Sequence, residues 1–168
     1  REFYRLVKQR PAPGGVLSQW IPLEQQPDNL TRGMIASLLE AFSEVTLWIP
    51  SDYEAILVAS DRPLTVDWAR WQQEWAKPSV ARSLMDVGFT SPYGLLGTYV
   101  AGTEALRRYV QGYPAMTDDH PRVEYFLSNA DRPFHPEELL ALAEPLGARL
   151  SRAEGLEAQR LDREREAN

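Results

Sequence analysis

The chain has 168 residues, a formal net charge of −6 and no cysteine. An apolar fraction of 43% with five tryptophans excludes a disordered protein, and the length corresponds to a domain of ordinary size. The absence of cysteine excludes disulfides and thiolate metal sites, and it fits a reducing compartment. The acidic balance argues against a nucleic-acid-binding protein. No apolar run approaches the ~20 residues of a membrane span.

The first 64 residues have the pattern of a parallel α/β sheet. Residues 2–10 are predicted to form an amphipathic helix with Phe3, Leu6 and Val7 on one face. The Pro13-Gly14-Gly15 turn then leads into residues 16–23, whose continuous apolar character predicts a strand covered on both faces. This order of helix, turn and buried strand is typical of the late part of such a sheet.

A second helix and a hairpin follow. One apolar stripe predicts a helix over residues 29–42, and it consists of Leu30, Met34, Ile35, Leu38, Leu39 and Phe42. Residues 45–49 and 55–59 are predicted as buried strands separated by Pro50-Ser51-Asp52. The short separation requires an antiparallel hairpin.

From Leu64 onward the chain is predicted to be helical. Trp68, Trp71 and Trp75 recur at helical spacing on a helix that begins near Asp67, and we expect this stripe to be core rather than a docking surface. Three domains are therefore expected: residues 1–64 as sheet and helices, residues 65–150 as a helical region, and residues 151–168 as a charged tail.

The helical region carries its own start and stop signals. Ser91-Pro92 is predicted to cap one helix, and Thr103-Glu104 to begin another that stops at Gly112. Another short helix is expected to end at Gly88, and a last amphipathic helix is expected over residues 136–150, with a break near Pro145.

Two groups of residues resemble a known family. The segments Arg1-Glu2-Phe3-Tyr4 and Pro13-Gly14-Gly15-Val16-Leu17-Ser18-Gln19-Trp20, continuing to Ser60-Asp61-Arg62-Pro63, resemble the spermidine synthase family of aminopropyltransferases. Thr117-Asp118-Asp119-His120-Pro121 with Val123-Glu124-Tyr125 resembles a segment of the bacterial, often membrane-fused type. The family has the S-adenosylmethionine-dependent methyltransferase fold, so the resemblance implies an α/β chain corresponding to the C-terminal half of a Rossmann-like sheet, with three late strands and a helical region.

The resemblance also implies what these residues do not supply. The family binds its nucleotide through a glycine-rich loop and an acid, and it presents the amine with an Asp near the end of the fourth strand; none has a counterpart in these 168 residues. The chain is therefore expected to be a C-terminal portion that has no catalytic, cofactor-binding or metal-binding residue and does not catalyse by itself. Its expected partners are the upstream half of the same protein and a polyamine substrate. Decarboxylated S-adenosylmethionine is the expected co-substrate of the full-length protein. That protein is expected in the cytoplasm, where it could also be tethered to the membrane.

Three residues are candidates for contact with the amine. The resemblance places Gln19 at the carboxyl end of the fifth strand, where an amide accepts hydrogen bonds from an ammonium group; the alternative is a polar residue bonded to its neighbours. Trp20, adjacent in the strand, is expected in the core. Trp48 or, as a competing candidate, Tyr53 is implied to line the methylene chain of the amine.

Asp118, Asp119 and His120 form the densest polar cluster. Paired carboxylates suit a distal ammonium, and His120 suits proton transfer near neutral pH. Two alternatives stay open, which are a metal site and an Asp-capped turn before Pro121; the turn is favoured because contiguous ligands rarely surround one ion.

The sequence is also consistent with a second class of function. The chain would then be a non-catalytic, methyltransferase-like interaction domain of a larger protein. In either case the late strands are expected in the order residues 16–21, 55–60 and 45–49, which leaves one edge of residues 16–21 unpaired. An unpaired apolar edge favours a homodimer or cover from the helical region.

Overall fold

The computed structural model describes residues 1–10, 14–23, 27–117, 136–145, 150–151 and 163. The chain divides into two compact units. The first comprises Arg1–Leu64 and Val100–Glu144, and the second comprises Thr65–Tyr99 and Pro145–Asn168. The chain thus leaves the first unit after Leu64 and returns to it at Val100.

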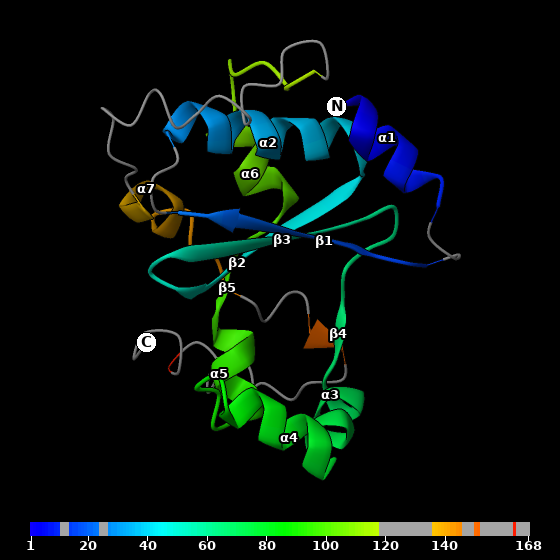
Figure 1. Ribbon diagram of the computed structural model, residues 1–168, viewed down its shortest axis with the longest axis vertical. Helices are drawn as coiled ribbons and strands as arrows, with labels where there is room; N and C mark the ends of the chain where they lie inside the picture. The colour runs from blue at the N-terminus through cyan, green and yellow to red at the C-terminus, as the bar shows by residue number, and fades with distance from the viewer. Residues whose placement is uncertain (11–13, 24–26, 118–135, 146–149, 152–162, 164–168) are drawn as a thin grey trace. The chain divides into compact units, whose positions relative to one another are not determined.

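A four-stranded sheet forms the centre of the first unit (Figure 1). Its strands are β1 (Leu17–Pro22), β2 (Glu44–Ser51), β3 (Glu54–Ser60) and β5 (Tyr99–Ala101), in the order β1-β3-β2-β5. Strand β3 pairs antiparallel with both β1 and β2. The predicted hairpin and the order β1-β3-β2 are therefore confirmed in a mixed α/β fold, whereas β5 is a fourth strand in a region that was predicted to be helical.

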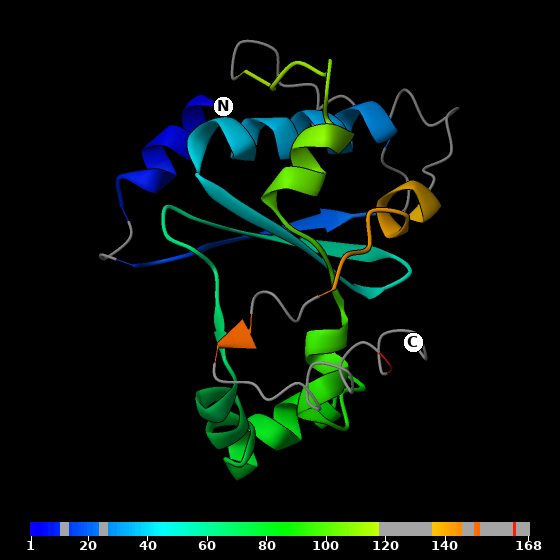
Figure 2. The same cartoon turned by 180° about the vertical axis from the view of Figure 1, so that it is seen from behind.

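Helices cover one face of this sheet. Figures 1 and 2 show α1 (Glu2–Lys8), α2 (Asp28–Ala41) and α6 (Thr103–Tyr109) on the same side. Leu57 pairs with Leu47, and Ile21 pairs with Ala55, which lies two residues from Leu57 on the same face of β3. Ile21, Leu57 and Leu47 therefore all point toward these helices, and each is fully buried. Their burial with Ile35 and Leu38 of α2 forms the core, since apolar area removed from water is the main stabilising term.

Strand β1 is not covered on both faces. Its burial alternates along the strand, and Ser18 and Trp20 are exposed while Ile21 is fully buried. The expectation of a strand covered on both faces is therefore wrong, because β1 lies at the end of the strand order and its second face is largely exposed. The continuous apolar run hid this alternation.

Helix α1 presents a different face to the core from the predicted one. Tyr4 is buried, whereas Phe3 and Leu6 are 54% and 59% exposed. Basic groups attach the helix to its surroundings. Arg1 Nε lies 2.9 Å from a Glu40 oxygen, and Lys8 Nζ donates to the Ala41 carbonyl at 2.8 Å. The apolar spacing predicted the helix correctly but not the face of the helix that packs against the core.

The segment that contains the last described helix belongs to the first unit. Helix α7 (Pro136–Leu140) inserts the fully buried Leu139 into the core. The helix predicted over residues 136–150 is thus much shorter, and the described backbone leaves it before Pro145, where the Glu144 N–H donates to the Val100 carbonyl at 2.8 Å.

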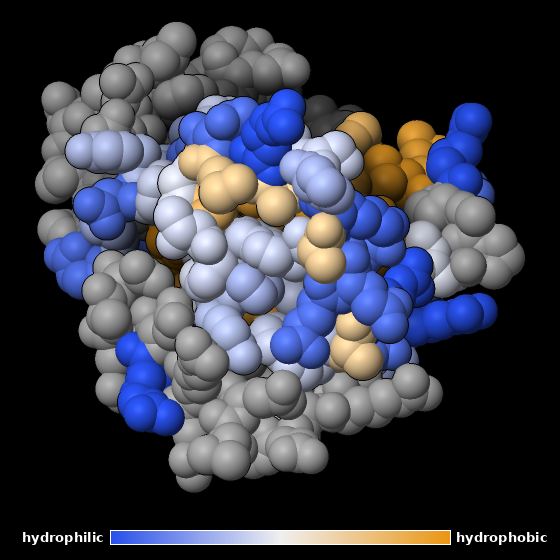
Figure 3. Space-filling model, turned by 90° about the horizontal axis from the view of Figure 1, so that it is seen from below, coloured by the Kyte–Doolittle hydropathy of each residue, from blue (hydrophilic) through white to orange (hydrophobic). Residues whose placement is uncertain are grey.

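The described residues of the second unit form three short helices and a two-stranded sheet. The helices are α3 (Trp68–Trp75), α4 (Pro78–Met85) and α5 (Pro92–Gly97), and β4 (Val66–Asp67) pairs in parallel with β6 (Leu150–Ser151). The predicted cap at Ser91 is confirmed, because Ser91 Oγ accepts from the Gly94 N–H at 3.1 Å. The predicted helix start near Asp67 is also confirmed, and there Asp67 Oδ1 accepts from the Arg70 N–H at 3.2 Å. The face drawn in Figure 3 is mostly hydrophilic, with a few separate apolar side chains.

The tryptophan stripe supplies part of the second unit's interior. Trp68 is buried with its ring centroid 4.9 Å from that of Tyr93, and Trp71 Nε1 donates to the Pro92 carbonyl at 3.2 Å. Its assignment to core rather than to a docking surface is confirmed for Trp68, while Trp71 and Trp75 are partly buried.

Across the described part of the chain, no helix has the length and apolarity that would let it cross a bilayer.

Candidate functional site

Gln19 lies in the middle of β1, on the face covered by α1. The strand continues for three residues to Pro22, so Gln19 does not occupy the carboxyl end expected from the sequence. Its Oε1 accepts a hydrogen bond from Tyr4 Oη at 3.3 Å, and its Nε2 donates to the Trp20 carbonyl at 2.9 Å. The amide therefore connects the helix to the strand.

The Tyr4 hydroxyl stays protonated in this position. Burial of its ring raises the pKa of Tyr4 to about 12, because a phenolate would lose its hydration there. At neutral pH the hydroxyl is a hydrogen-bond donor, which explains its pairing with the carbonyl oxygen of Gln19 rather than with a donor.

Trp48 lies on the opposite face of the sheet from Gln19. Trp20, Ile56 and Trp48 pair in register across β1, β3 and β2, whereas Gln19 pairs with Leu57 on the other face. The Trp48 indole is partly buried, and its Nε1 donates to Thr46 Oγ1 at 2.9 Å. Gln19 and Trp48 therefore do not share a site within the sheet.

Trp20 is a second aromatic on this face. Its side chain is 54% exposed, so the expectation that it packs in the core is wrong. The reason is the register, which places Gln19 toward the helices and its neighbour Trp20 away from them. Trp20 and Trp48 flank Ile56, and this row is an apolar surface that the sequence did not indicate.

Tyr53 lies in the turn between β2 and β3. Its carbonyl accepts from the Leu23 N–H at 2.8 Å, which places the turn next to the carboxyl end of β1. Its ring is 59% exposed. Of the candidates that the structure describes, Tyr53 lies nearest to the strand end where open α/β sheets bind ligands.

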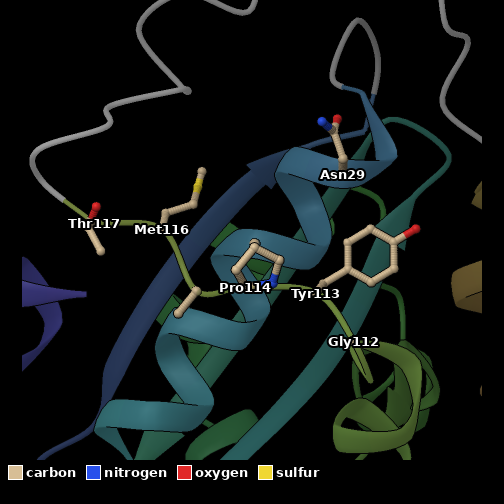
Figure 4. A pocket seen from close by; sticks show the side chains of 8 residues that line it. Asn29, Gly112, Tyr113, Pro114, Met116 and Thr117 are labelled. Carbon is tan, nitrogen blue, oxygen red and sulfur yellow. The ribbon is translucent and has the colours of Figure 1, made fainter.

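A pocket lies beside α2, where the segment of residues 112–117 crosses that helix (Figure 4). Its volume is about 460 Å³, and its lining consists of Asn29, Gly33, Gly112, Tyr113, Pro114, Ala115, Met116 and Thr117. Ser37 Oγ fixes the crossing segment, because it accepts from the Met116 N–H at 2.8 Å and donates to the Gly33 carbonyl at 2.8 Å. The volume suits a small ligand.

The candidates Asp118 and Asp119 come directly after this pocket in the sequence. They lie outside the described residues, as do His120 and Glu124. The structure therefore describes the chain up to Thr117, at the rim of the pocket, and does not test the ammonium, metal or turn interpretation of the cluster. Within the described ranges, no group of three metal-ligating side chains is present.

Arg32 forms an ion-pair and aromatic cluster next to the pocket. Its guanidinium lies 2.6 Å from Asp28 and 2.5 Å from Glu138, and it also donates to the Tyr109 carbonyl. The same group lies 3.8 Å and 4.8 Å from the ring centroids of Tyr109 and Tyr113. Tyr109 Oη in turn donates to Asp28 at 2.7 Å.

The sequence contained one sign of this cluster. Asp28 and Arg32 are four residues apart on a predicted helix, which is the spacing of an ion pair. Burial and the hydrogen bond to Asp28 raise the pKa of Tyr109 above its ordinary value, so its hydroxyl remains a donor. The contacts with Glu138 and Tyr113 join distant segments, and no local pattern indicates them.

No protein-family model, curated protein or solved structure matches this chain. The site is therefore interpreted from its own residues and geometry.

Proposed function

We propose that the chain is the C-terminal, acceptor-side portion of a spermidine synthase-like aminopropyltransferase of the cytoplasm, tethered to a membrane in the fused type. The observation that carries the proposal is the strand order β1-β3-β2 with β3 antiparallel to both neighbours. The fifth, seventh and sixth strands of a methyltransferase-like sheet have this order and these directions. Of the segments that resemble the family, residues 2–4 lie on α1, residues 17–20 lie on β1 and Ser60 ends β3, while residues 118–125 lie outside the described residues.

The proposed reaction transfers an aminopropyl group from decarboxylated S-adenosylmethionine to a diamine. A neutral amine nitrogen forms a bond to the carbon next to the sulfonium, the carbon–sulfur bond breaks with its electron pair going to sulfur, and the nitrogen loses a proton. In this proposal the upstream half supplies the carboxylate and the nucleotide site. The chain described above contributes positioning of the acceptor, which lowers the entropic cost of reaction.

Tyr53, Gln19 and Trp48 have different places in this proposal. Tyr53 offers an exposed ring beside the carboxyl end of β1, where it suits contact with the methylenes of a diamine. Gln19 offers an amide that accepts from an ammonium group, once its oxygen exchanges the Tyr4 hydroxyl for the ligand. Trp48 lies on the other face, so we assign the acceptor contact to Tyr53 in preference to Trp48.

One observation favours the alternative of a non-catalytic interaction domain. The Gln19 amide is already bonded through both its oxygen and its nitrogen, to Tyr4 and to the Trp20 carbonyl. A side chain with these partners serves to attach α1 to the sheet. In that case its substitution would lower stability without any effect on amine recognition.

The experiment compares Gln19→Ala with Tyr4→Phe in the longer protein that carries this chain. If Gln19 binds the amine, Gln19→Ala should raise the KM for the diamine about 10-fold with a nearly unchanged Tm, as expected for one lost hydrogen bond to a charged group. Tyr4→Phe, which removes the same internal bond but keeps the Gln19 amide, serves as the matched control and should not raise KM.

Two results would contradict the proposal. Equal losses of Tm in both variants with an unaltered KM would assign Gln19 to folding rather than to recognition of the amine. Absence of aminopropyl transfer by the longer protein to any diamine would reject the transferase itself.

A further inference from the structure

The outer edge of β1 carries backbone groups that point away from the sheet. Leu17 pairs with Ala59, and the Leu23 N–H donates to the Tyr53 carbonyl at 2.8 Å in the same register. Hydrogen-bonded pairs alternate along an antiparallel ladder, so Leu17, Gln19, Ile21 and Leu23 bond toward β3. The N–H and C=O groups of Ser18 and Trp20 therefore point to the outer edge, where the Trp20 carbonyl accepts a hydrogen bond from the Gln19 side-chain amide at 2.9 Å.

This edge lacks the features that protect the edges of monomeric sheets. Within the described residues, no strand pairs with it. Residues 16–23 contain no charged side chain, and Pro22 interrupts the edge only near its end. Large apolar side chains are exposed along β1 and on the helix attached to it, namely Phe3 at 54%, Leu6 at 59%, Val16 at 55% and Trp20 at 54%.

We infer that two copies of the 168-residue chain associate by antiparallel pairing of β1 with β1 of the second copy, around a two-fold axis at Gln19. Ser18 of each copy then lies opposite Trp20 of the other, and their outward N–H and C=O groups bond reciprocally. A register displaced toward Pro22 loses a bond, because proline has no N–H. This pairing also keeps the helix-covered faces of the two sheets on one side.

The chemistry of the edge selects a second copy as its occupant. A two-fold axis brings identical segments together, and an uncharged strand meets its copy without repulsion between like charges. Tyr4 holds α1 against β1, so pairing places both α1 helices on the same face of the extended sheet. Their exposed Phe3 and Leu6 side chains then lose contact with water. The inference concerns the 168-residue chain by itself, because in the longer protein of the proposed function the same edge of β1 would pair with the fourth strand of the upstream half.

Two double variants that introduce charged side chains at positions 18 and 20 test the register. In Ser18→Lys/Trp20→Lys the two-fold axis brings four ammonium groups together, and we expect a monomer by light scattering after size exclusion. In Ser18→Lys/Trp20→Glu each lysine lies opposite a glutamate of the other copy, and we expect the dimer to persist. Asp52→Lys, in the exposed hairpin turn, is the control and should remain dimeric like the parent chain.

A single cysteine gives an independent measurement, because the chain contains none. Gln19 lies opposite its copy as a non-hydrogen-bonded pair, whose Cα separation of about 4.5 Å suits a disulfide. Gln19→Cys should form a covalent dimer under mild oxidation, whereas Tyr53→Cys, at a more exposed position, should not. A monomeric parent chain, a dimer that survives Ser18→Lys/Trp20→Lys, or a failure of Gln19→Cys to cross-link would overturn the inference.

Discussion

At the scale of single residues, Tyr4 has a consequence for stability at high pH. Its pKa is raised by burial from 10.0 to about 12, so the unfolded chain loses this proton at lower pH than the folded chain. Stability is unaffected by Tyr4 below the unfolded value and falls as the pH rises from about 10 to about 12. We expect this group to lower the free energy of unfolding by roughly 1 kcal/mol between about pH 9 and about pH 11.

Urea unfolding at a series of pH values measures this effect. Tyr4→Phe should flatten part of the slope, while Tyr109, whose pKa is also raised by burial, continues to contribute in the same direction. Tyr53→Phe, at an exposed ring, is the control and should keep the slope of the parent. An unchanged slope in Tyr4→Phe would show that the ring does not keep its proton through burial.

At the scale of elements, the crossing of α2 by residues 112–117 depends on Gly33. A Cβ added at Gly33 would lie 2.9 Å from Met116 Cγ. Gly→Ala inside a helix usually stabilises by up to about 1 kcal/mol, but the displaced Met116 should reverse the sign. We expect Gly33→Ala to lower the free energy of unfolding by about 1 kcal/mol, measured by urea denaturation.

Gly94→Ala is the matched control within α5. The nearest atoms to its added Cβ are Ser91 Oγ at 3.6 Å and Phe89 Cδ1 at 3.9 Å, which are ordinary contacts. This variant should be neutral or slightly more stable. If Gly33→Ala also gained stability, the close packing of the crossing segment on α2 would be disproved.

At the scale of the whole molecule, the chain should not bind the nucleoside co-substrate by itself. No G-x-G-x-x-G loop is present in its 168 residues, and the backbone N–H groups of such a loop are what hold a nucleotide in Rossmann-like sheets. We expect isothermal titration with S-adenosylmethionine or its decarboxylated form to show no binding in the micromolar range. Micromolar affinity would mean that this chain contains a nucleoside site that its sequence does not indicate.

Local patterns were sufficient for most of the elements. The hairpin of β2 and β3, the helix α2, the start of α3 near Asp67 and the cap at Ser91 were predicted from periodicity and from residues within one turn. Gly88 and Gly112 have φ values of 95° and 82° just after α4 and α6, as expected where a helix stops. These features depend on interactions between residues close in sequence, so the sequence contains their causes.

The placement of the candidate residues was decided by the tertiary structure. Gln19 and Trp48 are both strand residues with suitable chemistry, but the pairing register directs them to opposite faces. The same register exposes Trp20, which was expected in the core. A shift of one residue would exchange the two faces, and a run of apolar residues does not specify which alternative occurs.

The sequence alone determined the hairpin of β2 and β3, because two apolar runs, turn residues and a short connection restrict their pairing. The place of β1 beside β3 followed from the family resemblance, and β4, β5 and β6 were not predicted. Tertiary contacts alone decided which side of α1 is buried and how Arg32 joins Asp28 to Glu138. The physical reason is distance along the chain. Burial of Tyr4 depends on α2 and β1, and Arg32 meets a carboxylate 106 positions away, so neither contact leaves a local pattern.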